Sequence, residues 1–306
     1  KLIKVSSIAF LFSFPITVYN FYEINLLTII NNVIIVPFVT IILFPLTLIT
    51  FLFPFLDPLL NIGIIFLENI SHFLNYFQIN LVVPKVNFLF FILYYIGVYF
   101  IYKGKWKTIF YLIFLVISVK ILPFLNSNTY VYFLDVGQGD STLIVGSHGN
   151  YAMLIDTGGK IKFEQEDWEV RNKEYDGASN IITFLKSLGI TKLDLLVGTH
   201  GDADHMGEAI NLVNNFAVDK VVFNKGSYND LEKSLIQVLE KKNIPYFQNL
   251  SEINLGNNKF YFLNDKEFGD ENNNSLVMYT NMEGFKFLFM GDAGVEVENY
   301  LREKYN

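Results

Sequence analysis

The chain contains no cysteine among its 306 residues. Disulfide bonds and thiolate metal ligands are therefore excluded together. An external compartment remains compatible with this composition, because oxidising conditions do not require cysteine. Histidine is also scarce, since His72, His148, His200 and His205 are the four in the chain.

Charge is missing from a long stretch near the N-terminus. Residues 24–56 contain no Asp, Glu, Lys or Arg, and at ~1.5 Å per residue a helix of that length exceeds the ~30 Å hydrocarbon core of a bilayer. The stretch is predicted to lie in a membrane, and Pro37, Pro45 and Pro54 predict kinked or broken helices within it. Further membrane spans are predicted at residues 5–20, 86–102 and 108–125.

A different pattern occupies residues 66–78, where polar side chains recur every three to four positions opposite an apolar face. Glu68, Asn75 and Gln78 belong to the polar stripe. The segment is predicted to be an amphipathic helix in the membrane interface, with a span that faces a channel as the alternative. His72 on this stripe is interpreted as solvated rather than as a metal ligand.

The charges divide the chain into a membrane region, residues 1–128, and a second domain, residues 129–306. The first region carries seven Lys against three carboxylates, a balance of +4, so the chain total of −7 leaves −11 on the rest. Lys103, Lys105 and Lys107 form a short basic loop, which favours the cytoplasmic side. The span at 108–125 then places the acidic domain outside the cell, and we expect a multi-pass protein of the cell membrane.

Short β-type runs begin at Tyr130 and are separated by turn residues. Strands come first in a meander and later alternate with helices, which predicts an α/β domain whose sheets are covered by helices. Polar loops follow several of these strands, and strand ends of this kind are where a site is expected. Helices are predicted at about 178–188, 207–215, 229–241 and 294–304.

The stretch "GTHGDADHMGE" places two histidines and two aspartates within six positions. His200, Asp202 and Asp204 can share one side of an extended loop, and a helix that starts near Met206 brings His205 round to them. Two nitrogen and two carboxylate ligands suit Zn²⁺ or Mn²⁺ better than Ca²⁺. The alternative is that the two aspartates complement the positive end of a helix dipole.

Other carboxylates and polar side chains occur near the same strand ends. Asp292 ends an apolar strand in "FMGDAG", where it is either a metal ligand or the N-cap of the next helix. His148 in "GSHGN" is expected in a solvent-exposed turn. Asp135, Asp140 and Asp156 either support ligating histidines or are turn carboxylates, the turn role being favoured. Three more candidates for supporting or substrate-loop positions are Gln138, Asn274 and Ser275.

Five segments in order, "FLDVGQGDSTLI", "LIDTGG", "LDLLVGTHGDADHMGE", "NNNSLVMY" and "FLFMGDA", resemble the metallo-β-lactamase-like domain of ComEC-type DNA-uptake channels of bacterial competence. The upstream "NNVIIVPFVTIILFPLTLI" is similar to the end of that family's membrane domain. The resemblance implies an α-helical transmembrane region followed by an αββα sandwich. It also implies an external domain that hydrolyses one strand of incoming duplex DNA while the other strand passes inward.

The resemblance also implies a site with two divalent metal ions, Mn or Zn. Carried over to this chain, His200 and Asp202 would bind one ion, Asp204 and His205 the other, and Asp292 would bridge them. Asp204 and His205 would act in catalysis. The wider superfamily usually has His at the second position of this loop, and Asp202 favours a harder metal such as Mn²⁺.

The ends of the chain depart from the family pattern. A further loop of the "HHGS" type follows the bridging aspartate in the family, whereas this sequence ends at Asn306, and it begins at Lys1 rather than at Met. We therefore expect a segment of a longer protein, with the sandwich incomplete at its C-terminus and one metal ligand beyond it. The metal-dependent phosphodiesterase or DNase activity is then expected of the full-length protein.

Three functions compete. The leading hypothesis is a DNA-uptake channel segment with a nuclease domain, whose partners are duplex DNA at the external domain, a single strand in the channel, the lipid bilayer and other competence proteins, without a nucleotide cofactor. Since −11 charges disfavour phosphate binding, a membrane-anchored hydrolase of another ester is the second. The third is a DNA-guiding module with a degenerate metal site. Candidate DNA contacts are Tyr151, Lys160, Lys162 and Lys225.

Overall fold

A computed structural model describes residues 2–160 and 176–305 and divides the chain into two compact units, Lys1–Lys120 and Ile121–Asn306. The boundary predicted from composition was residue 128. The units separate earlier because the apolar 3₁₀ helix η3 (Leu122–Leu125), at the end of the last predicted span, packs against the short helix η4 (Ser147–Gly149) of the second unit.

The first unit is helical. The described residues contain three helices long and apolar enough to cross a membrane: Leu2–Phe21 and Thr28–Leu52 in the first unit, and Thr108–Leu125, which continues past its end. A shorter apolar helix lies at Phe88–Tyr102. These match the predicted spans. The elements of the unit are α1 (Leu2–Phe21), β1 (Glu23–Asn25), α2 (Thr28–Pro37), η1 (Phe38–Leu43), α3 (Phe44–Leu52), η2 (Pro54–Leu56), α4 (Asp57–Tyr76), β2 (Asn80–Val82), α5 (Phe88–Tyr102) and α6 (Thr108–Ile121).

Proline shapes the uncharged stretch in two ways. Helix α2 continues through Pro37 into the π-helix η1, and α3 follows directly with Pro45 near its start. Proline removes one i→i−4 hydrogen bond of an α-helix, because it has no N–H. A π-helical turn, which uses i→i−5 hydrogen bonds, follows Pro37 at the place where the regular bonding is interrupted. The helical path ends at Phe53, before Pro54. Residues 66–76 of the predicted amphipathic segment lie in α4, which begins at Asp57 and ends at Tyr76, so Gln78 falls outside the helix.

The second unit contains two main sheets. The first has six strands in the order β10-β9-β7-β5-β4-β3, and the second has four antiparallel strands in the order β11-β12-β13-β14. The strands are β3 (Tyr130–Phe133), β4 (Thr142–Val145), β5 (Ala152–Ile155), β7 (Leu195–Val197), β9 (Val221–Val222), β10 (Tyr246–Phe247), β11 (Glu252–Leu255), β12 (Asn258–Phe262), β13 (Met278–Met282) and β14 (Phe285–Phe289), with a minor pair β6 (Lys192–Leu193) and β8 (Ala217–Val218).

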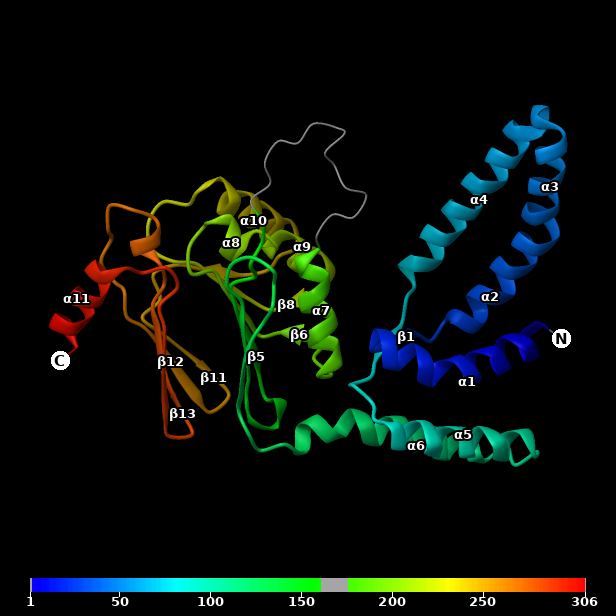
Figure 1. Cartoon of the computed structure of the whole chain (residues 1–306), viewed down its shortest axis with the longest axis horizontal. Coiled ribbons are helices and arrows are strands. Elements are labelled where there is room, and N and C mark those ends of the chain that lie inside the picture. Colours follow the sequence, from blue (N-terminus) through cyan, green and yellow to red (C-terminus); the bar gives the residue numbers. More distant parts are fainter. Residues whose placement is uncertain (1, 161–175, 306) are drawn as a thin grey trace. The chain divides into compact units, whose positions relative to one another are not determined.

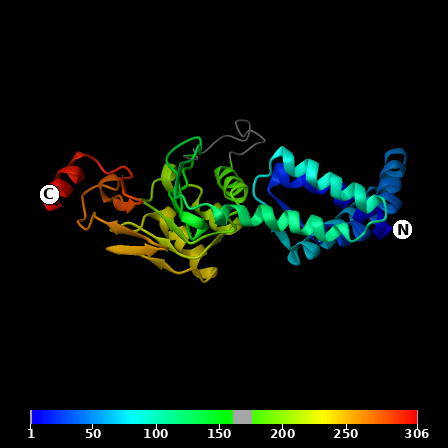
Figure 2. The same cartoon turned by 90° about the horizontal axis from the view of Figure 1, so that it is seen from below.

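Helices cover the outer face of the six-stranded sheet, and the C-terminal helix packs against residues at one end of the four-stranded sheet (Figure 1). The outward side chains Tyr261 and Leu288 of the four-stranded sheet stay exposed. The layers follow the αββα order that the family resemblance implies. Seen from below, α11 lies at the opposite end of this unit from α7 (Figure 2). The helices are α7 (Gly177–Ser187), α8 (Ala203–Met206), α9 (Ala209–Asn215), α10 (Asp230–Lys241) and α11 (Val295–Lys304).

Alternation along the buried strands builds two separate cores. Leu154 and Leu196 face the helices α7, α9 and α10, whereas their neighbours Met153 and Val197 face the second sheet. Successive side chains of a strand point to opposite faces, so a sheet that is covered on both sides needs apolar residues at every position. This explains why β5 and β7 read as continuous apolar runs rather than as alternating ones.

Strands β5, β7, β9 and β10 run parallel. Their carboxyl ends therefore meet at one edge of the sheet, where the loops after Ile155 and Val197 begin. Strand β14 belongs to the other sheet, and Asp292 follows three residues after its last residue, Phe289. Residues from three distant parts of the sequence are thereby brought to one place.

Candidate metal centre

His200 follows strand β7 and is completely buried. Its Nδ1 atom lies 3.2 Å from Thr199 Oγ1 and 3.3 Å from Ser275 Oγ. Its Nε2 atom is buried without a hydrogen-bond partner among the residues that the structure describes, although Asp202 Oδ2 lies 3.5 Å away. A buried polar atom without a partner is rare and calls for an explanation such as a bound ion.

His205 lies on the one-turn helix α8 and is also buried. Its Nδ1 atom is 2.9 Å from Asp156 Oδ2, and its Nε2 atom is 3.1 Å from Asp292 Oδ1. Burial alone would lower the pKa of His205, but the hydrogen bond to Asp156 and the charges of Asp156, Asp292 and Asp204 outweigh burial and raise this pKa to about 9. The ring is thus held between carboxylates.

Asp156 connects the two histidine-bearing segments. Its carboxylate accepts hydrogen bonds from Thr199 N at 2.8 Å and Thr199 Oγ1 at 2.6 Å, in addition to its contact with His205. The residue follows β5 with a positive φ of 56°, a conformation that Asp adopts more readily than most residues. The side chain is buried and binds other loops, which differs from the turn role that the sequence favoured.

Asp292 completes the group from the second sheet. It follows β14, and its backbone N–H donates to Ser275 Oγ at 3.2 Å. The alternative role as a helix N-cap is wrong, because the N-cap of α11 is Gly294. The turn through Gly291, which has a positive φ, displaces the start of the helix beyond Asp292 and leaves its carboxylate facing His205.

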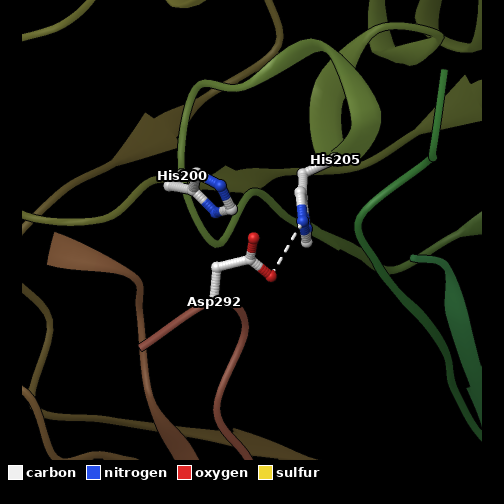
Figure 3. A group of neighbouring side chains, drawn as sticks. All are labelled: His200, His205 and Asp292. Atoms are coloured by element: carbon white, nitrogen blue, oxygen red, sulfur yellow. Dashed lines mark ion pairs between the residues drawn. The ribbon is translucent and has the colours of Figure 1, made fainter. Parts of the chain in front are cut away.

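His200, His205 and Asp292 form one cluster, shown in Figure 3. One ligand atom from each lies within 4.8 Å of the others, and the two imidazole rings are 4.1 Å apart between centroids. The unpartnered Nε2 atom of His200 is the observation that a cation would explain. Two nitrogens and one carboxylate oxygen suit Zn²⁺ or Mn²⁺, so the residues present fit a divalent metal ion.

Asp202 and Asp204 lie outside this cluster. The sequence suggested an extended loop up to Met206, but α8 begins at Ala203, so the alternation of side chains assumed for 200–204 does not apply. Asp202 occupies the N-cap position of α8 without a side-chain capping bond, and its side chain is 45% exposed. Asp204 is close enough to help raise the pKa of His205.

The supporting residues predicted from the sequence fall into two groups. Ser275 is buried and contacts both His200 and the backbone of Asp292, so it belongs to the site. Asn274 instead binds both backbone groups of Phe268 and fixes a neighbouring loop.

The glycine loop after β3 contributes through its backbone. The carboxylate of Asp135 is exposed and accepts a hydrogen bond from Gly137 N, as expected of a turn. Asp140 N donates to the carbonyl of Asp204, and the carbonyl of Gln138 accepts from Gly159 N. The side chains of Asp140 and Gln138 are exposed, so their loop supports α8 through main-chain contacts.

The predicted DNA contacts have different outcomes. Tyr151 is 2% exposed and is not a surface contact, because it packs at the start of β5 in the core between the sheets. Lys225 donates to the carbonyl of Asp265, and Lys160 is exposed. Lys162 lies outside the described residues. His148 is exposed, as expected.

Two residues of the site environment have no signal in the sequence. Thr199 precedes His200 and binds Asp156. Asn229 caps α10 and also donates from Nδ2 to the carbonyl of Gly201, next to His200, at 2.7 Å. Both act through contacts between segments distant in the chain, which a local motif does not reveal.

Metal binding is expected to depend on pH through His205. With a pKa of about 9 this imidazole is protonated at neutral pH, and a cation has to displace the proton. Apparent affinity should rise by up to about tenfold per pH unit as the pH increases toward that value. The stability of the metal-free chain depends on pH in the opposite direction. Protonation of His205 stabilises the fold fully below the ordinary pKa of 6.5, and this contribution is lost as the pH rises through about 9.

The measurement is calorimetric titration with Zn²⁺ or Mn²⁺ across this pH range, in two buffers with different ionisation enthalpies. The buffer difference counts released protons, and we expect about one proton per bound cation at pH 7. An affinity that is independent of pH, with no proton released, would contradict the assignment of His205 as a ligand.

Two sheets flanked by helices, with two buried histidines and an aspartate converging at the strand ends, define an α/β sandwich that carries a candidate metal centre. The chain belongs to the metallo-beta-lactamase superfamily, whose family model matches residues 134–305, more than half of the chain. A second family model, Competence protein, matches residues 1–108. The predicted order of a competence-type membrane region and a metallo-β-lactamase-like domain is confirmed, and the superfamily implies the use of divalent metal.

A curated relative spans both regions. ComE operon protein 3 of Bacillus subtilis (strain 168) is 28% identical over 332 residues, which cover 97% of this chain and 41% of that protein. The chain therefore spans less than half the length of this relative.

Two solved structures are similar to part of this chain. A metallo-beta-lactamase from Staphylococcus aureus subsp. aureus COL is 17% identical, with 54% of this chain and 43% of that chain covered and a TM-score of 0.34. The metallo-beta-lactamase fold protein YhfI from Bacillus subtilis is 14% identical, with 54% and 60% covered and a TM-score of 0.33.

Proposed function

We propose that this chain is part of a multi-pass membrane channel for DNA uptake, and that its second unit is an external metal-dependent nuclease domain acting on one strand of incoming DNA. The observation that carries the proposal is the union, in one chain, of a competence-type membrane region with a metallo-β-lactamase fold that contains a cluster of buried histidines. A secreted esterase would have no use for membrane helices interrupted by a π-helical turn.

Several groups of the second unit support a phosphodiesterase role. His200, His205 and Asp292 would hold a divalent cation, and Asp202 and Asp204 are the proposed additional ligands if two ions bind. When bound, the metal would activate water and offset charge on a phosphate oxygen. Asp156 fixes the orientation of His205, and Ser275 links His200 to the backbone of Asp292. Asp204, whose charge acts on His205, is the proposed base that orients and deprotonates the attacking water.

The proposed partners follow from this role. Duplex DNA would meet the second unit, a single strand would pass the membrane region, and other competence proteins would deliver the DNA. The charge of −11 on residues after about 128 opposes phosphate binding, and bound cations would offset part of it. No nucleotide cofactor is required.

The test uses the full-length protein that contains this segment, loaded with Mn²⁺ or Zn²⁺. In the double variant His200→Ala plus His205→Ala we expect metal content to fall to background and cleavage of end-labelled DNA to fall at least about 100-fold, because ligand removal should exceed the 10- to 100-fold cost of losing an outer partner. The variant His148→Ala, which alters an exposed histidine away from the cluster, is the control and should retain both. Undiminished cleavage in the double variant would refute the nuclease role.

The acidity of the second unit favours one alternative, a membrane-anchored hydrolase of a different ester. Assaying the metal-loaded protein against DNA and against small phosphate and carboxylate esters distinguishes the two. Hydrolysis of small esters that depends on His200, without any cleavage of DNA, would favour the alternative.

A further inference from the structure

The first residues of the second unit are apolar and exposed. Leu122, Phe124 and Leu125 in η3 are 60%, 55% and 69% exposed, although they belong to the candidate span Thr108–Leu125. Lys120, one turn earlier, can extend its ammonium group to the headgroups while its stem stays in the apolar region. This helix end therefore has the composition of a membrane interface.

The turn at His148 is bound directly to this helix end. Its backbone N–H donates to the carbonyl of Asn126 at 2.6 Å, and its Nδ1 atom lies 3.0 Å from the carbonyl of Phe124. A Cβ atom at Gly149 would lie 3.4 Å from the ring of Phe124. Because these contacts are short, the β4–β5 turn and η3 lie side by side, and a membrane surface that meets one of them also meets the other.

A turn of the second sheet is held at the same end. Thr129 N donates to Glu283 Oε1 at 2.9 Å, and Glu283 lies in the turn between β13 and β14. The next strand begins with Phe285, whose side chain is 71% exposed. In Figure 1 the β4–β5 and β13–β14 turns lie at one end of the two sheets, and α8 lies at the other end. We call the first end, formed by Leu122–Leu125, Ser147–Gly149 and Glu283–Phe285, the basal face.

We propose that the basal face is a membrane-contacting surface, seated at the boundary between headgroups and acyl chains, and that the metal cluster consequently faces away from the bilayer. Lipid is the occupant that the observations favour, because the apolar side chains continue directly from a candidate span. Leucine and phenylalanine at the end of such a span are suited to this boundary.

Strand direction then fixes the position of the cluster. β5 starts beside the basal turn at Ala152 and reaches Asp156 after four steps, or roughly 13 Å at ~3.3 Å per residue. β14 likewise starts at Phe285 on the basal face and leads to Asp292. A substrate would therefore meet the cluster before it reaches the lipid surface, and this holds whether or not the cluster is catalytic.

The absence of cysteine makes a direct test available, because one introduced cysteine gives one labelled position. We would reconstitute the chain in phosphatidylcholine–phosphatidylglycerol vesicles with Leu125→Cys, Phe285→Cys or Gly269→Cys carrying an environment-sensitive fluorophore, and quench it with spin-labelled lipids. Gly269 is exposed in the loop after β12, at the end of the sheets that carries the cluster, and a side chain there meets nothing within 4 Å.

Lipid quenching several-fold stronger at 125 and 285 than at 269 is the expected result. An unquenched label at 125 or 285, or equal quenching at 269, would overturn the proposal. Energy transfer between labelled copies at 285 without lipid quenching would also overturn it, in favour of a contact between chains. Should Phe285→Cys fail to fold, as judged by circular dichroism, Lys286→Cys repeats the test at the adjacent exposed position.

Discussion

Replacing Asp156 by Asn is expected to lower the affinity of the protein for Zn²⁺ or Mn²⁺ by about 10- to 100-fold, the usual cost of losing the partner that orients a ligating histidine. Asn has nearly the same shape and tolerates the positive φ of 56°. Its amide, however, puts a donor where one of the two carboxylate oxygens now accepts from Thr199 and His205. The buried network loses a charge-assisted bond, so we also expect the free energy of unfolding to fall by about 1–3 kcal/mol.

Metal affinity would be measured by competition with a chelating dye, and stability by denaturant unfolding of the chain in detergent. Asp135→Asn is the matched control, because this exposed carboxylate accepts a single hydrogen bond from the backbone of Gly137. It should change neither quantity measurably. Wild-type affinity in Asp156→Asn would show that the hydrogen bond to His205 does not position a ligand.

Gly139→Ala is expected to abolish metal binding without touching a ligand. Gly139 has a φ of 79°, and a Cβ atom there would overlap the carbonyl oxygen of Asp204. That carbonyl belongs to α8, the same single turn that carries His205. The loop has to move or the turn has to shift, and either change displaces the imidazole from Asp156 and Asp292.

Gly284→Ala separates the steric effect from backbone strain. Gly284 has a similar φ of 88°, but a Cβ atom there meets nothing within 4 Å. Both variants incur the cost of a left-handed alanine, about 1–2 kcal/mol, and only Gly139→Ala adds the clash. Metal titration and unfolding of the two variants should differ accordingly. Equal effects in both would mean that the close approach to Asp204 is unimportant.

Much of the fold could be predicted from local patterns. The uncharged and apolar runs identified the membrane helices, and the helices at 177–187, 209–215, 230–241 and 295–304 were each predicted to within a few residues. Strands β8, β10 and β11 were not predicted, because two of them are two residues long and the third, "EINL", carries a weak pattern. Short strands are defined by their neighbours rather than by their own composition.

The ligand set remains a prediction, and the structure brings three of its five residues together. His200, His205 and Asp292 were expected to be ligands and lie together, while Asp202 and Asp204 lie outside their cluster. The reason is local: Asp202 and Asp204 lie on either side of a helix start that falls three residues earlier than the sequence suggested. The roles of all five remain predictions that the metal titrations test.

Local sequence patterns were sufficient to predict a membrane region followed by an α/β domain, because uncharged runs and strand periodicity reflect the solvent that each segment meets. The absence of cysteine also excludes thiolate metal ligands, which leaves histidine and carboxylate as the ligands that the motif offers. Which carboxylates contact His205 is set by the tertiary structure. Asp156 and Asp292 reach His205 from separate sheets, and only the packing of those sheets, over the apolar core between them, sets the distances.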